Sequence, residues 1–314
     1  MNKIKALIFN DTRPAIHFGC ERVMDNLLLL LKQCNIEPIH LHSTFDFWEN
    51  KESFVRSKIK ECDLVIVNGE GSIHHSNAKA ASLAAIGPLA RSLGKPAILL
   101  NTTFYKNNSA IYSNIAKYSS IYVRDAYSAS EFIKHGGTAF YAPDLTFFTD
   151  IPLLRCSSDI TRSDNSRLRI LIGESVLKDT STQLSQLAER KGWERLYIHH
   201  TDDLNLSIDT HFKEMQRTDL IITGRFHTVC FCINMGIPFI ALESNTNKIS
   251  NLLNDCFQST SRLLTHDLLN CPDLNTFSTW TALEKRSIFE FKERGKSRFN
   301  TLTDDLKMLA STTA

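Results

Sequence analysis

Short apolar runs alternate along this chain with longer segments in which apolar residues recur at helical spacing. The run Ile4–Asn10 is typical of a buried strand, and the segment Cys20–Cys34 after it has the apolar stripe of a helix. Further strands are predicted at Pro38–His42, Asp63–Asn68, Ala97–Asn101 and Ile121–Val123, and helices at Ser53–Glu61 and Ala78–Leu93. Strands that alternate with helices favour a parallel sheet.

A polar, irregular stretch at about Ile151–Arg167 separates this series from a second one and is the best candidate for a linker. Beyond it, strands are predicted at Leu168–Ile172, Leu196–His199, Asp219–Ile222 and Pro238–Leu242, and helices at Ser181–Gly192, Ile208–Arg217 and Phe226–Met235. The last stretch, Trp280–Leu309, predicts a charged helix that packs on the outside or crosses back to the first domain.

Two segments of the chain resemble each other. CDLVIVNGEG followed by LGKPAILLN, from Cys62 to Asn101, parallels TDLIITGRFH followed by MGIPFIALE, from Thr218 to Glu243. In each, Asp-Leu opens an apolar strand, a turn with glycine ends it, and a helix leads to Gly-x-Pro and another strand. The repeat predicts an α/β fold of two Rossmann-like domains with parallel sheets, at 1–152 and 168–314, joined by a linker at 153–167. One continuous sheet is the alternative.

If two such domains face a cleft, ligands belong outside the carboxyl ends of the strands, where the polar clusters of this sequence lie. Gly224 ends one strand, and Arg225, Phe226 and His227 open the helix that follows. The first amides of a helix carry partial positive charge, so an Arg and a His beside them predict an anion site. The alternative is a core helix whose Arg only caps it or pairs with a carboxylate.

The other strand ends carry weaker candidates. Gly69, Glu70, Gly71 and Ser72 form a turn that allows close approach of a ligand, although it is neither a dinucleotide fingerprint nor a phosphate loop, and Ser72 could cap the next helix. Arg124 could pair internally with Asp125, while Asp144 is a candidate acid or base and equally a turn cap. His199 ends a strand of the second half, and Glu243 and Lys248 follow its last strand.

Composition removes several classes of function. Lys and Arg total 36 against 34 for Asp and Glu. This near balance gives no overall positive potential that would attract nucleic acid. The eight cysteines include no CxxC pair, which indicates free buried thiols and a cytoplasmic protein. His74 and His75 are adjacent, but no third ligand stands at a recognisable spacing, so no metal site is predicted. No apolar run approaches the length of a membrane span.

Three blocks of the sequence together resemble the polysaccharide pyruvyl transferase family. They are NGEGS after an Asp-opened strand, YVRDAYS followed by APDLTF, and TGRFH followed by GIPFIAL and Asn247-Lys248, in the family's order over about residues 60 to 255. The family is similar to GT-B glycosyltransferases in fold. Its members transfer the pyruvyl group of phosphoenolpyruvate to sugar hydroxyls and commonly form a pyruvate ketal on a cell-surface polysaccharide or its lipid-linked precursor.

The resemblance implies roles for individual residues. Arg225 would clamp the anionic donor, His227 would be the acid or base, Lys248 would add a second cation, and Asp11 or Glu70 would take the acceptor proton. The donor then belongs to the second domain and the acceptor to the first. Substrate contacts are expected at Gly69, Gly71, Ser72, His74, Arg124, Asp144, His199, Gly224, Phe226, Glu243, Asn247 and Lys248.

The implied partners are phosphoenolpyruvate, as a substrate with no further cofactor, and a sugar or lipid-linked oligosaccharide. Such an acceptor makes the inner face of the membrane a compatible location and peripheral membrane contact a compatible behaviour. Two other functions stay open. A GT-B glycosyltransferase would use a nucleotide sugar, with Glu243 on a ribose, and a non-catalytic module would bind a sugar without turnover.

Overall fold

The structure is a computed structural model that describes residues 3–153, 168–199, 207–265 and 274–311. The chain divides into two compact units. The first unit comprises Met1–Ile16, Cys20–Phe148 and Arg294–Ala314, and the second comprises His17–Gly19 and Thr149–Glu293. The sequence placed the boundaries at 1–152 and 168–314; all but the first residue of the predicted linker 153–167 lies outside the described residues.

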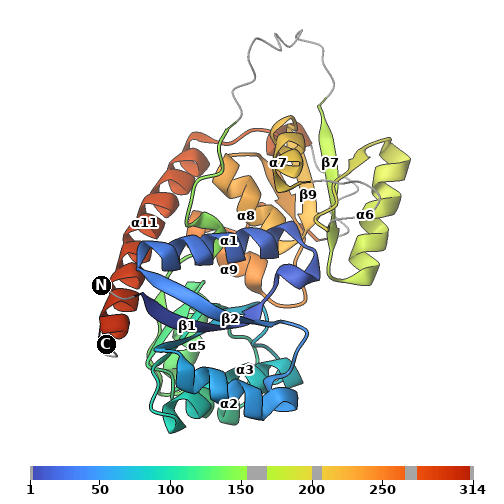
Figure 1. The fold of residues 1–314 in the computed structure, drawn as a ribbon. Helices are drawn as coiled ribbons and strands as arrows, with labels where there is room; N and C mark the ends of the chain where they lie inside the picture. The colour runs from blue at the N-terminus through green and yellow to red at the C-terminus, as the bar shows by residue number, and fades with distance from the viewer. Residues whose placement is uncertain (1–2, 154–167, 200–206, 266–273, 312–314) are drawn as a thin grey trace. The chain divides into compact units, whose positions relative to one another are not determined.

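The first unit is built on a six-stranded parallel sheet with the order β2-β1-β3-β4-β5-β6 (Figure 1). All seven residues of the inner strand β3 are buried, since the chain on both faces covers it. The strands are β1 (Ile4–Asp11), β2 (Ile36–Ser43), β3 (Leu64–Glu70), β4 (Ala97–Thr102), β5 (Ser120–Val123) and β6 (Phe140–Tyr141). The helices are α1 (Phe18–Gln33), α2 (Glu52–Glu61), α3 (Ala78–Ser92), α4 (Ser109–Ile115) and α5 (Ala126–Lys134).

The second unit contains a four-stranded parallel sheet with the order β10-β9-β7-β8. Its strands are β7 (Ile170–Ser175), β8 (Glu194–Arg195), β9 (Leu220–Gly224) and β10 (Phe239–Ala241). Its helices are α6 (Lys178–Lys191), α7 (Ile208–Gln216), α8 (Phe226–Met235), α9 (Lys248–Phe257) and α10 (Leu274–Phe277). The two parallel sheets confirm the predicted α/β class and exclude one continuous sheet among the described residues.

Several predicted elements change in detail. The strand expected at Leu196–His199 is wrong, because the paired residues are Glu194 and Arg195 and only an isolated bridge joins His17 to His199. Ser72 does not cap a helix; α3 begins at Ala78 and the side chain of Asn77 accepts the amide of Ala80. The helices α4 and α9 were not predicted.

The final helix α11 (Ala282–Ser311) is divided between the two units at Arg294. In the first unit, the hydroxyl of Tyr122 on β5 donates to the carboxylate of Asp305 at 2.7 Å, and the rings of Phe148 and Phe299 pack edge to face. In the second, Lys292 pairs with Asp150 at 2.6 Å. Among the described residues, no helix combines the length and the apolar character that spanning a bilayer requires.

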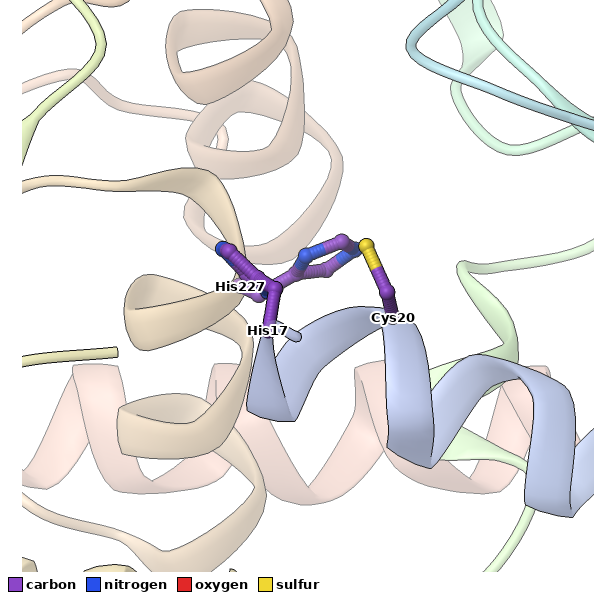
Figure 2. Close-up of side chains that lie close together, drawn as sticks. All are labelled: His17, Cys20 and His227. Atoms are coloured by element: carbon purple, nitrogen blue, oxygen red, sulfur yellow. The ribbon is translucent and has the colours of Figure 1, made fainter. Parts of the chain in front are cut away.

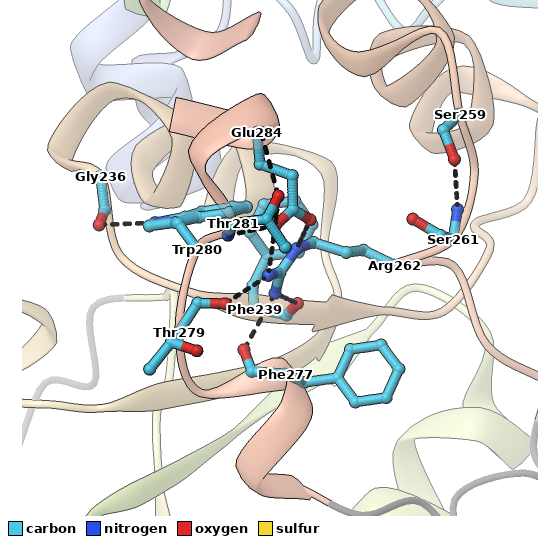
Figure 3. A network of polar contacts seen from close by, with 10 residues as sticks. All are labelled: Gly236, Phe239, Ser259, Ser261, Arg262, Phe277, Thr279, Trp280, Thr281 and Glu284. Carbon is cyan, nitrogen blue, oxygen red and sulfur yellow. Dashed lines mark hydrogen bonds and ion pairs between the residues drawn. The ribbon is translucent and has the colours of Figure 1, made fainter. Parts of the chain in front are cut away.

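The start of α11 is fixed by a buried guanidinium in the second unit (Figure 3). Arg262 donates to both carboxylate oxygens of Glu284, at 2.6 and 3.2 Å, and lies 4.0 Å from the centre of the Trp280 ring. Its other N–H groups donate to the carbonyls of Phe239, Phe277 and Thr279. Glu284 also accepts the amide of Thr281, whose hydroxyl accepts the amide of Glu284, which is a capping box.

We predict that Arg262→Met destabilises the second unit by about 3–5 kcal/mol, because it leaves the Glu284 carboxylate and three carbonyls without their donor. Arg286→Met is the matched control, since Arg286 forms an exposed pair with Glu290 whose loss should leave the unfolding midpoint close to that of the wild type. Urea unfolding of both variants measures the difference. Equal midpoints for the two variants would contradict a structural role for the Arg262 network.

Candidate functional site

In the second unit, polar side chains gather where the neighbouring strands β7 and β9 end. The two strands are parallel, and Ser175 at the end of β7 pairs with Gly224 at the end of β9. A side chain at position 224 would press on Ser175, with its Cβ only 2.7 Å from the Ser175 Cβ, so glycine is required there. The next residue, Arg225, is the N-cap of α8, and its amide donates to the Thr223 hydroxyl at 3.1 Å.

Glu174, the penultimate residue of β7, links the functional groups of this edge. Its Oε2 lies 3.4 Å from Nδ1 of His199 and 3.8 Å from Nη2 of Arg225, and it accepts the amide of Ile198. Burial alone would raise the pKa of Glu174, but the hydrogen bond from His199 and the charge of Arg225 bring that pKa below its ordinary value. The carboxylate is therefore ionised at neutral pH and orients both partners.

Three histidines of the second unit lie around this carboxylate and arginine. The ring of His17 packs edge-on against His199, with centroids 5.0 Å apart, and against His227, with centroids 5.4 Å apart; Figure 2 shows the second pair. Gly19 makes the approach possible, because a Cβ there would clash with the His227 ring.

The protonation state of His17 follows from its surroundings. Its Nδ1 accepts the amide of Gly19 at 3.0 Å, which places the ring proton on Nε2 in the neutral form. Burial, followed by the charges of His227, His199 and Arg225, holds the pKa of His17 well below its ordinary value. His17 is therefore a neutral imidazole at pH 7 in contact with His227.

The N-terminus of α8 is suited to an anion. The first amides of a helix have no acceptor within the helix, and the N-cap residue Arg225 makes no side-chain capping hydrogen bond to them. The partial positive charge of the helix end adds to the charge of Arg225, and His227 lies in the same first turn. The predicted residues Gly224, Arg225, Phe226 and His227 therefore lie together at the end of β9 and the start of α8.

The N-terminus of α9 differs from that of α8, because the Glu243 carboxylate already accepts its amides. The Glu243 carboxylate accepts the amides of Ser244, Ile249 and Ser250 at 2.9 to 3.3 Å. The structure therefore gives Glu243 a helix-capping role where the sequence suggested contact with a ligand. Asn247 is the N-cap residue of α9 without a capping side chain, and Lys248 is its first residue, with Nζ 3.4 Å from Oδ1 of Asn245.

The first unit holds a second polar cluster, centred on Glu70 at the end of β3. Its carboxylate accepts the Thr12 hydroxyl at 2.5 Å and the Asn68 amide at 3.1 Å, and the Cys20 thiol lies 3.7 Å from it. The Glu70 side chain is buried, and burial raises its pKa. Asp11, the other predicted proton acceptor, instead makes a two-pronged ion pair with Arg13.

Left-handed backbone conformations mark the carboxyl ends of three adjacent strands in this unit. Asn10, Glu70 and Asn101, at the ends of β1, β3 and β4, have φ angles of 65°, 40° and 55°. Such conformations cost energy for residues with a Cβ and persist where contacts over-determine them. Here the Asn10 side chain donates to the carbonyl of Asn68 at 2.6 Å, and the Asn101 side chain accepts the amide of Leu145.

Arg124 and Asp144 form a buried ion pair at 2.7 Å, with side chains 2% and 0% exposed. The sequence suggested Asp125 as the partner of Arg124; Asp125 caps α5 by accepting the amide of Ser128. Arg124 also donates to the Thr103 hydroxyl, and Asp144 accepts the amide of Thr146. This pair holds the loops after β4 and β6, and its burial favours a structural role over direct substrate contact.

The remaining predicted residues lie in the turn after β3. Gly69 is needed because a Cβ there would clash with Thr102, and Ser72 accepts a long hydrogen bond of 3.5 Å from Asn10. The rings of His74 and His75 are joined by a 2.8 Å contact between their Nδ1 atoms. Gly71 and His74 are partly exposed, so a ligand can reach them.

Sequence reasoning missed two residues of the cluster around Arg225 in the second unit, Glu174 and His17. Glu174 follows Gly173 in a strand that was expected to end at Ile172, so its position at a strand end was hidden. His17 lies in a loop without periodicity just before α1. The rule that functional residues sit at carboxyl ends of parallel strands would have found Glu174 once β7 was given its full length.

Comparisons with known proteins connect this chain to a family. A family model described as polysaccharide pyruvyl transferase matches residues 17–246. No match was found among the curated proteins. A functionally uncharacterized protein from Klebsiella pneumoniae is 11% identical, with a TM-score of 0.50, over 84% of this chain and 93% of that one. An α-glucosyltransferase solved with UDP-glucose and DNA is 8% identical, with a TM-score of 0.43, over 95% of each chain. The first of these structures is a likeness of fold alone.

We predict that His17→Gln reduces the loss of stability on acidification. A histidine whose folded pKa is depressed takes up its proton more readily when unfolded, so its full stabilisation is present above the unfolded pKa of about 6.5 and is lost as pH falls below it. Thermal unfolding between about pH 8 and about pH 5.5 should therefore show a shallower fall for the variant than for the wild type. Parallel pH profiles would contradict the neutral, desolvated state of His17.

Proposed function

Because the chain belongs to the polysaccharide pyruvyl transferase family, we propose that it transfers the pyruvyl group of phosphoenolpyruvate to hydroxyls of a sugar. The sugar belongs to a cell-surface polysaccharide or its lipid-linked precursor, and the product is a pyruvate ketal. The observation that carries the proposal is the N-terminus of α8, where Arg225 is the N-cap residue and His227 lies in the first turn.

The donor has the charges that this site accommodates. Phosphoenolpyruvate carries a carboxylate and a phosphate, and a guanidinium can bind either group through two parallel hydrogen bonds. The Arg225 side chain is 16% exposed and lies 3.8 Å from Glu174, a loose ion pair that orients the guanidinium. The amides at the start of α8 supply further donors for the same anion.

The reaction needs one proton at the methylene carbon and the removal of two from the acceptor. Protonation of that carbon makes its neighbour electrophilic, a sugar hydroxyl attacks there, and inorganic phosphate leaves; attack by a second hydroxyl closes the ketal. Of the two hydroxyl protons, one balances the new methyl group and the other leaves with phosphate. His227 is the proposed acid, and general acid catalysis of this kind contributes about 10²- to 10⁴-fold. Neutral His17 packs against it without adding a second charge.

On the acceptor side, Glu70 is a better candidate base than Asp11. Burial places the pKa of Glu70 above its ordinary value, which strengthens it as a proton acceptor, and the Thr12 hydroxyl at 2.5 Å offers a path to it. Arg13 donates to both carboxylate oxygens of Asp11, which makes Asp11 less available to accept a proton from the sugar. The capping role of Glu243 removes the residue that a nucleotide-sugar enzyme would have used for a ribose.

We predict transfer when the protein is incubated with phosphoenolpyruvate and a panel of lipid-linked and nitrophenyl sugars. Phosphate release should accompany a gain in acceptor mass equal to one pyruvic acid less one water. His227→Gln should slow both by about 10²-fold or more, because the proton donor is lost. Binding of phosphoenolpyruvate with neither product, across the panel and in folded protein, would indicate a binding module and count against transfer.

We predict that Arg225→Ala abolishes the thermal stabilisation that phosphoenolpyruvate gives the wild type. A donor present at about 100 times its Kd stabilises the folded state by about 2.7 kcal/mol, and the variant should lose most of it. Arg217→Ala is the control, since Arg217 is an exposed residue at the end of α7. Equal stabilisation of Arg225→Ala and wild type would remove Arg225 from the donor site. Stabilisation by a nucleotide sugar in place of phosphoenolpyruvate would favour glycosyl transfer.

A further inference from the structure

A cavity of about 360 Å³ lies in the first unit beside β2, the edge strand of its sheet. Residues of β2, the loop after it and the first turn of α2 line the cavity, among them His40, His42, Asp46, Lys51 and Phe54. Its volume lies within the range of small-molecule sites, about 300–1,000 Å³. None of these residues has a part in the clusters around Glu70 or Arg225.

The polar groups of the cavity are of mixed charge. Asp46 and Lys51 form an ion pair at 2.7 Å in which both side chains are about half exposed, 42% and 53%. Lys58 lies 5.9 Å from the Phe54 ring, and Lys79 is engaged by the carbonyl of Thr44. Because the nearest cation is already paired with a carboxylate, the cavity does not favour an anion. A neutral ligand with hydroxyl groups can use Asp46 as acceptor and Lys51 as donor.

A buried ring nitrogen in the cavity wall points to a ligand with hydrogen-bonding groups. His42 is only 4% exposed, and its Nε2 has no hydrogen-bond partner among the described residues. Leaving a buried polar atom without a partner costs about 1–3 kcal/mol, so such atoms in native proteins call for an explanation. A turn of the His42 ring toward the cavity that it lines would let a hydroxyl of a bound molecule satisfy this nitrogen, as donor or acceptor according to the tautomer.

The cavity also has an apolar platform. The Phe54 ring is 44% exposed, and His40 meets it edge-on with centroids 5.2 Å apart, which fixes the orientation of both rings. A sugar ring has a face of C–H groups bounded by hydroxyls. The C–H face matches the exposed ring of Phe54, and the hydroxyls match Asp46, Lys51 and His42.

We propose that this cavity is a subsite for one neutral sugar residue of the acceptor. The sugar stacks on Phe54 and exchanges hydrogen bonds with His42, Asp46 and Lys51. Its role as an acceptor subsite rests on the proposed pyruvyl transfer, whereas sugar binding itself does not. A site outside the reacting cluster would recognise a residue of the saccharide other than the one that receives the pyruvyl group.

The test measures direct binding of a panel of methyl glycosides of neutral hexoses and N-acetylhexosamines, by NMR titration of labelled protein without phosphoenolpyruvate. At least one glycoside should shift the signals of His42 and Phe54. Phe54→Ala should weaken its affinity roughly tenfold, because the stacking surface is lost. Phe45→Ala is the matched control, since Phe45 is 68% exposed, belongs to the same segment and does not line the cavity.

A second variant, Asp46→Ala, changes an exposed side chain and should also weaken binding. No binding by any glycoside of the panel, or equal affinity in Phe54→Ala and Phe45→Ala, would overturn the proposal. Binding at this cavity by a protein that transfers no pyruvyl group would support the subsite and refute the transferase function. Pyruvyl transfer with the same acceptor KM in Phe54→Ala as in the wild type would support the transferase function and refute the subsite.

Discussion

The parallel pairing of β7 with β9 is the constraint on which the proposed donor site depends. Ser175 pairs with Gly224, and this register brings Glu174 and Arg225 to the same edge of the sheet. Gly173 of β7 packs against the Thr223 side chain of β9, and Gly224 of β9 packs against Ser175 of β7. A Cβ at either glycine would clash with these neighbours. A shift of one residue would turn the Glu174 carboxylate to the other face and leave Arg225 without its partner.

In the first unit, residues at the strand ends have strained backbone conformations, and buried hydrogen bonds stabilise them. Glu70 combines a left-handed φ of 40° with a buried carboxylate, and both features are destabilising in isolation. Thr12 and Asn68 donate the compensating hydrogen bonds to the Glu70 carboxylate, and Asn10 donates to the carbonyl of Asn68. A network of this kind rigidifies the carboxyl ends of these strands. It also holds in place the Glu70 carboxyl group, whose pKa is raised by burial.

The sequence predicted most elements of the fold because they are determined locally. The helix Phe226–Met235 was predicted with its observed bounds, since an apolar run lies between Arg225 and a glycine that takes the left-handed conformation. The partners of side chains were not predictable in the same way. The pairing of Arg124 with Asp144, the contact of His17 with His227 and the capping of α9 by Glu243 depend on tertiary packing that periodicity does not encode.

The central claim is that phosphoenolpyruvate binds at the start of α8. Hydrogen–deuterium exchange of the full-length protein, with and without phosphoenolpyruvate, measures this at the level of short peptides. The account predicts added protection in a peptide that covers Thr223–Thr228, because the donor would engage the amides of the first turn of α8. Protection that spares this peptide and appears elsewhere in the chain would contradict the account.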